Sequence, residues 1–155
     1  MNYIKDILDY IGFTGPLLIS LITAISLFEK PNYLFSFIFG SLLNNKLNEI
    51  LKLWIKERRP INSVDYLDNA NIIGAHKYGM PSGHAQIISF AIIFLFLTKG
   101  PPTWLLLSIF IYFLTVYQRW SFRRHTLEQL FIGTAVGSIF GYIIFWITKR
   151  YLERL

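Results

Sequence analysis

Apolar residues fall into five long stretches along the chain, each bounded by charged residues or proline. The stretches run from Ile11 to Phe28, Pro31 to Asn45, Tyr78 to Thr98, Gly100 to Gln118 and Gln129 to Thr148. A helix needs about 20 mostly apolar residues to cross a membrane, whereas barrel strands are only about ten residues long. Because backbone groups in lipid must be satisfied internally, the pattern predicts an all-α integral membrane bundle of about five transmembrane helices.

The composition supports a membrane location. Of the 155 residues, 54% are hydrophobic and only 15% are charged, whereas a water-soluble domain carries about 25% charged residues. No long linker or low-complexity tract divides the chain, so residues 1–155 are expected to form a single domain. Asp6 and Asp9 precede the first stretch, which is unlike the basic start of a signal peptide and favours a retained first helix.

Charge and residue types argue against several other functions. The net charge of +6 would suit nucleic acid, but the aromatic residues lie mainly within the apolar stretches, so no nucleic-acid partner is expected. The chain has no cysteine, and its three histidines show no ligand-like spacing with Glu49, Glu57 or Glu128. We therefore expect no metal site and no cofactor. His76 lies in a polar loop and is expected to be solvated.

Three polar clusters are predicted to meet at one end of the bundle. If the chain crosses the membrane alternately, the second and fourth helices end on the side where the third and fifth begin. The clusters are Lys52-x6-Arg59-Pro60, Pro81-Ser82-Gly83-His84 and Arg119-x5-His125-x3-Gln129. Ionisable residues near a membrane span indicate a functional site, and the convergence of three clusters strengthens that indication.

The first two clusters suit the binding of a tetrahedral anion. Lys52 and Arg59 are seven residues apart, on one face of a helix that Pro60 is expected to end, so both cations can address one anion. Ser82 is a candidate N-cap, and Gly83 lets a phosphate approach the first amides of the third helix. Taken alone, each cluster also fits a simpler role, as snorkelling cations or as a helix cap.

The histidines add proton transfer and a nucleophile. His84 follows the predicted phosphate site and is placed to donate a proton. His125 and Gln129 are i, i+4 neighbours, so the Gln129 amide oxygen is expected to accept a hydrogen bond from one imidazole nitrogen and to leave the other as a nucleophile. The alternative is a basic patch around Arg119 at the membrane surface, with His125 as an interfacial cap.

Together the clusters resemble the three-part signature of the type 2 phosphatidic acid phosphatase superfamily, K-x6-R-P, P-S-G-H and S-R-x5-H-x3-D. Gln118 stands where the signature has Ser, and Gln129 stands where it has Asp. The segments Lys77–Ser82 (KYGMPS) and His125-Thr126-x2-Gln129 are similar to the dolichyl-diphosphatase branch, in which Gln is usual at that position.

The resemblance implies a metal-independent phosphatase of an internal membrane, such as the endoplasmic reticulum. It implies that His125 attacks phosphorus and forms a phosphohistidine, that His84 is the general acid, and that Gln129 orients His125. The residues that it implies for binding the phosphoryl oxygens are Lys52, Arg59, Ser82, Gly83 and Arg119. The implied substrate is a polyprenyl (dolichyl-type) diphosphate.

Two alternative functions stay open at this point. A lipid monophosphate of the phosphatidic acid type fits the same chemistry, and Gln129 also fits an inactive membrane protein that binds lipid phosphates without turnover. A neutral Gln129 stabilises the developing charge on His125 less than a carboxylate does. The diphosphate is favoured because its leaving group, a phosphate monoester, is less basic than an alkoxide.

Small residues form a stripe on the last predicted helix. Gly133, Gly137 and Gly141 repeat every four residues and so share one face. Such a stripe allows close helix packing, either within the bundle or between two copies of the chain. Packing within the bundle is the favoured alternative.

Overall fold

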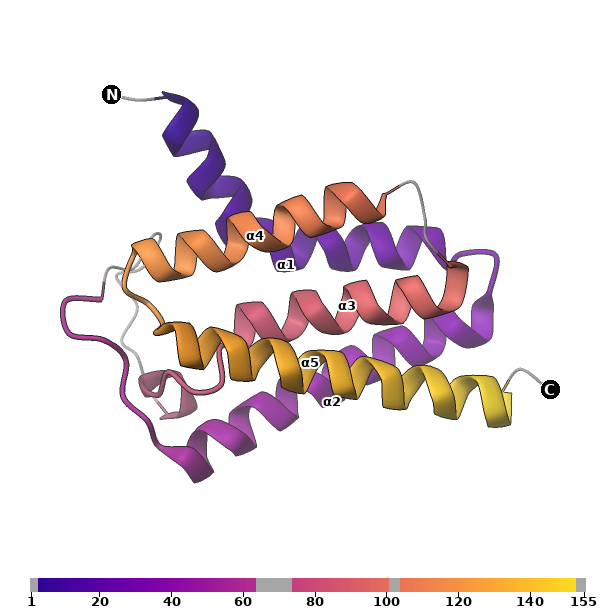
Figure 1. Cartoon of the computed structure of the whole chain (residues 1–155). Coiled ribbons are helices and arrows are strands. Elements are labelled where there is room, and N and C mark those ends of the chain that lie inside the picture. Colours follow the sequence, from indigo (N-terminus) through magenta and orange to yellow (C-terminus); the bar gives the residue numbers. More distant parts are fainter. Residues whose placement is uncertain (1–2, 64–73, 101–103, 153–155) are drawn as a thin grey trace.

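The chain folds as a bundle of five α-helices, which a computed structural model describes for residues 3–63, 74–100 and 104–152. The helices are α1 (Tyr3–Ser26), α2 (Pro31–Ile55), α3 (Gly83–Lys99), α4 (Leu105–Ser121) and α5 (Leu127–Ile147). A 3₁₀ turn, Gly74–Lys77, precedes α3, and a π-helical turn, Thr148–Leu152, follows α5. The predicted all-α membrane bundle is confirmed (Figure 1).

Helix α3 lies at the centre of the bundle. It contacts all four other helices, most extensively α5, while α1 packs along α4. In Figure 1, α2 and α4 end at the left-hand end of the bundle, where α3 and α5 begin. This is the arrangement that alternate crossing predicts, and it brings the polar clusters to one end.

The outer surface of the bundle is apolar. Large hydrophobic side chains face outwards, for example Leu106, which is 79% exposed, and Phe131, which is 72% exposed. Within the described residues, two helical segments are long and apolar enough to cross a membrane by these criteria alone, Tyr3–Ser26 and Leu127–Leu152. Helix α3 is equally apolar in character but has only 17 residues. An exterior of this kind suits hydrocarbon better than water.

Several helix boundaries differ from the predicted stretches. α1 begins at Tyr3 rather than Ile11, because charged residues can continue a helix beyond its apolar part. Pro16 lies inside this helix, and Figure 1 shows that α1 is bent along its length, as an internal proline causes. α3 begins at Gly83 rather than Tyr78, because Ser82 is its N-cap and accepts a hydrogen bond from the Ala85 N–H.

The predicted end of the second helix is wrong. α2 stops at Ile55, and Lys56 adopts a left-handed conformation with φ of 55°, while its N–H still bonds the Lys52 carbonyl. The chain has therefore already left the helix before Arg59 and Pro60. Arg59 reaches the site from a non-helical segment, which is held by a backbone bridge between Arg58 and Tyr78.

The glycine stripe of α5 packs against α3. A Cβ atom on Gly133 would lie 2.5 Å from the Ser82 carbonyl oxygen, and one on Gly141 would lie 2.8 Å from the Phe90 carbonyl oxygen. A Cβ on Gly137 would overlap the backbone at Gln86. The stripe thus serves packing within the bundle, and it allows the backbones of α3 and α5 to approach closely.

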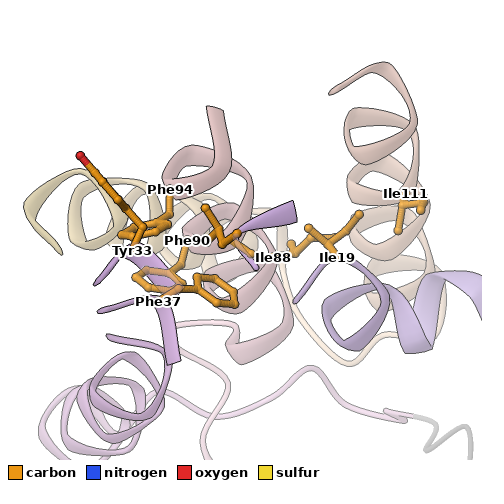
Figure 2. Close-up of a cluster of buried hydrophobic side chains, with 9 residues drawn as sticks. Ile19, Tyr33, Phe37, Ile88, Phe90, Phe94 and Ile111 are labelled. Atoms are coloured by element: carbon orange, nitrogen blue, oxygen red, sulfur yellow. The ribbon is translucent and has the colours of Figure 1, made fainter. Parts of the chain in front are cut away.

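Aromatic side chains fill the core between α2 and α3. The Phe37 ring stacks on Phe90 with 5.7 Å between centroids and lies 5.7 Å from the Phe94 ring. Ile19 and Ile111 extend the cluster towards α1 and α4 (Figure 2). Since lipid is as apolar as these side chains, close van der Waals packing holds the helices together here.

Candidate active site

A cavity of about 480 Å³ opens at the end of the bundle where the polar clusters meet. Of the eight residues predicted for the site, six line this cavity: Lys52, Arg59, Gly83, His84, Arg119 and His125. They come from α2, α3, α4 and the segments between the helices. The predicted convergence of the three clusters is therefore present in the fold.

Four cationic side chains surround the cavity. Lys52, Arg119 and Arg124 are each 5% exposed, and Arg59 is half-buried. Like charges held this close repel one another, so a bound anion stabilises the arrangement. Guanidinium groups also offer paired N–H donors that match the oxygens of a phosphate.

Arg59 is fixed by backbone carbonyl groups. Its Nε and one terminal nitrogen donate to the His76 carbonyl at 3.2 Å, and the other terminal nitrogen donates to the Arg124 carbonyl at 3.0 Å. This second nitrogen also lies 3.2 Å from His125 Nε2. Arg59 thus joins the segment after α2 to the segment before α5, beside the predicted nucleophile.

His125 makes the contact that its spacing from Gln129 predicts. Its Nδ1 lies 3.2 Å from Gln129 Oε1. Thr126 is the N-cap of α5 and forms a capping box with Gln129, so the side chains of Thr126 and Gln129 are fixed at the start of the helix. Burial, followed by the nearby charges of Arg59, Arg119 and Lys52, lowers the pKa of His125 well below its ordinary value. A neutral imidazole is the form that can act as a nucleophile.

His84 lies in the first turn of α3 and faces the same cavity. The Phe13 ring of α1 lies 5.6 Å from the His84 ring. On the same Phe13 ring, the Arg119 guanidinium lies 5.5 Å from the centroid. Phe13 therefore contacts both a predicted proton donor and a predicted phosphate ligand.

Ser82 and Gln129 lie behind the cavity wall rather than in its lining. Both are completely buried. Ser82 caps α3 through its hydroxyl, and its backbone N–H donates to the Gln129 carbonyl at 3.0 Å. Gly83, the next residue, does line the cavity, so the amino end of α3 faces the space where an anion would lie.

Sequence reasoning missed several residues around the cavity. Arg124 is not among the residues predicted for the site but lines the cavity, and His76, although exposed as expected, also borders it. Asn48 lines the cavity and donates to Gln86 Oε1 at 2.8 Å and to the Pro81 carbonyl at 3.2 Å. A signal for Asn48 was present, because Asn44, Asn48 and Lys52 form a polar stripe at i, i+4 and i+8.

Comparison with known proteins agrees with this geometry. The sequence profile of the PAP2 superfamily matches residues 32–153. The chain belongs to this superfamily. The fold also matches a crystal structure of a transmembrane PAP2-type phosphatidylglycerolphosphate phosphatase from Bacillus subtilis, with a TM-score of 0.67 and 19% identity over 100% of this chain and 79% of that one.

Related proteins include dolichyldiphosphatases. The chain is 31% identical to Dolichyldiphosphatase of Saccharomyces cerevisiae, over 70% of this chain and 49% of the relative. It is 30% identical to Dolichyldiphosphatase 1 of Mus musculus, over 83% and 58% respectively. It is also 32% identical to Lipid phosphate phosphatase epsilon 1, chloroplastic, of Arabidopsis thaliana, over 72% and 38%. The chain thus spans about half the length of the relatives it matches.

Proposed function

We propose that this protein is a membrane phosphatase that removes the terminal phosphate of a polyprenyl (dolichyl-type) diphosphate. The observation that supports the proposal is one cavity lined by both predicted catalytic histidines, His84 and His125, and by four cationic side chains. The cations and the amino end of α3 would bind the terminal phosphate. Preorganised positive charge stabilises the phosphoryl oxygens in the transition state, which is the main requirement for phosphoryl transfer.

In the first proposed step, His125 Nε2 attacks the terminal phosphorus. The N–P bond forms while the bond from phosphorus to the bridging oxygen breaks. His84 gives a proton to that oxygen, and the lipid monophosphate leaves. When the substrate binds, the negative charge on the non-bridging oxygens draws the Arg59 guanidinium away from His125 Nε2 and towards the phosphate. Lys52, Arg59 and Arg119 then hold these oxygens during the reaction.

In the second proposed step, water hydrolyses the phosphohistidine. The water oxygen bonds to phosphorus, the N–P bond breaks, and the electron pair returns to His125. His84, now neutral, accepts the proton of the water, and inorganic phosphate leaves. No co-reactant besides water is needed. Every step is assigned to a side chain or to water, and EDTA in the assay tests whether a metal ion takes part.

A diphosphate substrate is favoured over a lipid monophosphate. The leaving group of a lipid diphosphate is a phosphate monoester, whereas a monophosphate must expel a more basic alkoxide. Two further observations support this choice. Arg124 adds a fourth cation to the cavity, and the relatives above include proteins named dolichyldiphosphatases. The resemblance of the site motifs to the dolichyl-diphosphatase branch is the reason for proposing the endoplasmic reticulum or another internal membrane as the location.

The test is phosphate release by the purified protein in detergent containing EDTA. We expect a polyprenyl diphosphate to be hydrolysed faster than phosphatidic acid, and His125→Ala to release no phosphate from either. Equal rates on the two lipids, or faster hydrolysis of phosphatidic acid, would refute the proposed preference for a diphosphate substrate. Activity that the chelator removes would instead indicate a metal mechanism. Lipid binding without turnover by the unmutated chain would indicate a protein that only binds lipid phosphates.

A further inference from the structure

Hydrogen bonds hold the Gln129 amide at both ends. Its Nε2 donates to Glu57 Oε1 at 2.6 Å and to the Arg58 carbonyl at 2.9 Å. Its Oε1 accepts a hydrogen bond from the Thr126 N–H at 3.3 Å and faces His125 Nδ1. In the flipped amide, the oxygen would face two acceptors and the NH₂ group would face an N–H. The network therefore assigns the orientation of the amide, with its oxygen towards His125.

A second contact shows independently which nitrogen of the neutral His125 ring carries the proton. The Arg59 guanidinium has only donors, so His125 Nε2, 3.2 Å from it, must be an acceptor. The proton of the neutral ring then lies on Nδ1 and is donated to Gln129 Oε1. This tautomer leaves the lone pair of the ring on Nε2, the atom that is proposed to attack phosphorus.

We propose that Glu57 is a positioning residue that acts on His125 through Gln129. This inference rests on the proposed phosphohistidine mechanism. When Nε2 bonds to phosphorus, the imidazole becomes positively charged. The Glu57 carboxylate polarises the Gln129 amide, and the amide oxygen then stabilises that charge at the Nδ1–H group. Hydrogen bonds in such a chain strengthen one another, particularly where water is scarce.

The proposal accounts for a Gln in place of the Asp expected from the superfamily signature. The negative charge is still present, but it lies one amide group farther from the histidine. In many proteins, a carboxylate next to a functional histidine fixes the orientation of the ring and raises its basicity. We infer that Glu57 does the same for His125, through the Gln129 amide.

The surrounding backbone holds Glu57 in place. Its carbonyl accepts a hydrogen bond from the Gly79 N–H at 2.8 Å, and the neighbouring Arg58 pairs with Tyr78. A Cβ atom on Gly79 would overlap the Gln129 amide. The segments after α2 and before α3 therefore enclose this amide closely, and only glycine leaves room for it at position 79.

The test is Glu57→Gln, which keeps an acceptor for Gln129 but removes the charge. Its matched control is Glu29→Gln, which removes an exposed carboxylate from the turn between α1 and α2. For Glu57→Gln on the diphosphate substrate, we expect kcat to fall about 10-fold, as for other outer-shell partners, with KM changed by less than about twofold. The control variant is expected to match the unmutated protein in both constants.

The pH profile separates an electrostatic role from a structural one. A carboxylate behind His125 favours the protonated ring, so its loss lowers the pKa of His125. The acidic limb of kcat/KM is then expected to move to lower pH in Glu57→Gln. The other groups around the cavity stay unchanged in this variant: Glu49, Lys52, Arg59, His76, His84, Arg119 and Arg124. A shift of the limb therefore reports the loss of the Glu57 charge.

Two results would overturn the inference while leaving the proposed function standing. One is unchanged kcat in Glu57→Gln while His125→Ala is inactive, and the other is a lower kcat with an unmoved acidic limb. If Glu57→Gln does not fold, ¹⁵N-histidine NMR of the unmutated protein provides the test. The inference requires the Nδ1–H tautomer of His125. The Nε2–H tautomer would refute the proposed series of hydrogen bonds from Glu57 through Gln129 to His125. If His125→Ala keeps full activity, the proposed function itself fails.

Discussion

Gly133→Ala tests whether the site depends on the close approach of α5 to α3. Gly133 lies near the start of α5, close in the chain to Gln129, and faces the Ser82 backbone. The added Cβ would lie 2.5 Å from the Ser82 carbonyl oxygen and 3.1 Å from its nitrogen. Ser82 directly precedes Gly83 and His84, so any shift of this backbone moves the proposed proton donor.

The required shift follows from the contact distances. Ordinary van der Waals contact begins at 3.4 Å, so the Ser82 oxygen must move by about 0.9 Å to accept the Cβ, at a cost of about 1–3 kcal/mol for overpacking. A misplacement of about 1 Å at a catalytic group lowers the rate by about 100-fold. We therefore expect kcat of Gly133→Ala to fall by about two orders of magnitude.

Gly141→Ala is the matched control, because it makes a similar overlap far from the site. Its Cβ would lie 2.8 Å from the Phe90 carbonyl oxygen, about 12 Å farther along α5. The assay compares phosphate release with the thermal unfolding midpoint in detergent. Both variants are expected to lose stability, but only Gly133→Ala loses most of its activity. Full activity in Gly133→Ala, with the same loss of stability as the control, would refute the reasoning.

Three further predictions test the charges and the buried polar network. Arg119→Lys keeps the charge but loses the paired donors, so kcat/KM for the diphosphate is expected to fall roughly 10- to 100-fold, measured by phosphate release. Because burial and neighbouring cations lower the pKa of His125, the nucleophile stays neutral in mild acid, and the acidic limb of kcat/KM is expected below the ordinary histidine value of 6.5. Gln86→Leu removes the partner of Asn44 and Asn48, with contacts of 2.8 Å each. It is expected to destabilise the fold by about 1–3 kcal/mol in thermal unfolding.

The site residues that could be predicted are those whose position depends on local spacing or on helix order. His125 and Gln129 meet because i and i+4 positions adjoin at a helix start, whatever else the bundle does. Lys52, His84 and Arg119 converge because each lies at a helix end and the helices alternate in direction. These relations follow from the apolar pattern and need no knowledge of side-chain packing.

The residues that could not be predicted depend on backbone turns and long-range contacts. Lys56 has a left-handed backbone conformation although it is not glycine, and no local sequence pattern predicts that α2 ends there. Glu57 was dismissed because its spacing from the histidines suggested no metal ligand. Its carboxylate instead meets the Gln129 amide across 72 positions of the chain, a contact that exists only once the segment after α2 has turned towards α5.

Helix α1 belongs to the site although the superfamily match begins only at residue 32. A Cβ on Gly12 would lie 2.7 Å from the Leu114 carbonyl oxygen, so α1 packs directly on the backbone of α4. This packing sets the next residue, Phe13, against both His84 and the Arg119 guanidinium. A ring in that position attracts the cation and restricts the imidazole. The first helix therefore supplies part of the cavity wall through Phe13.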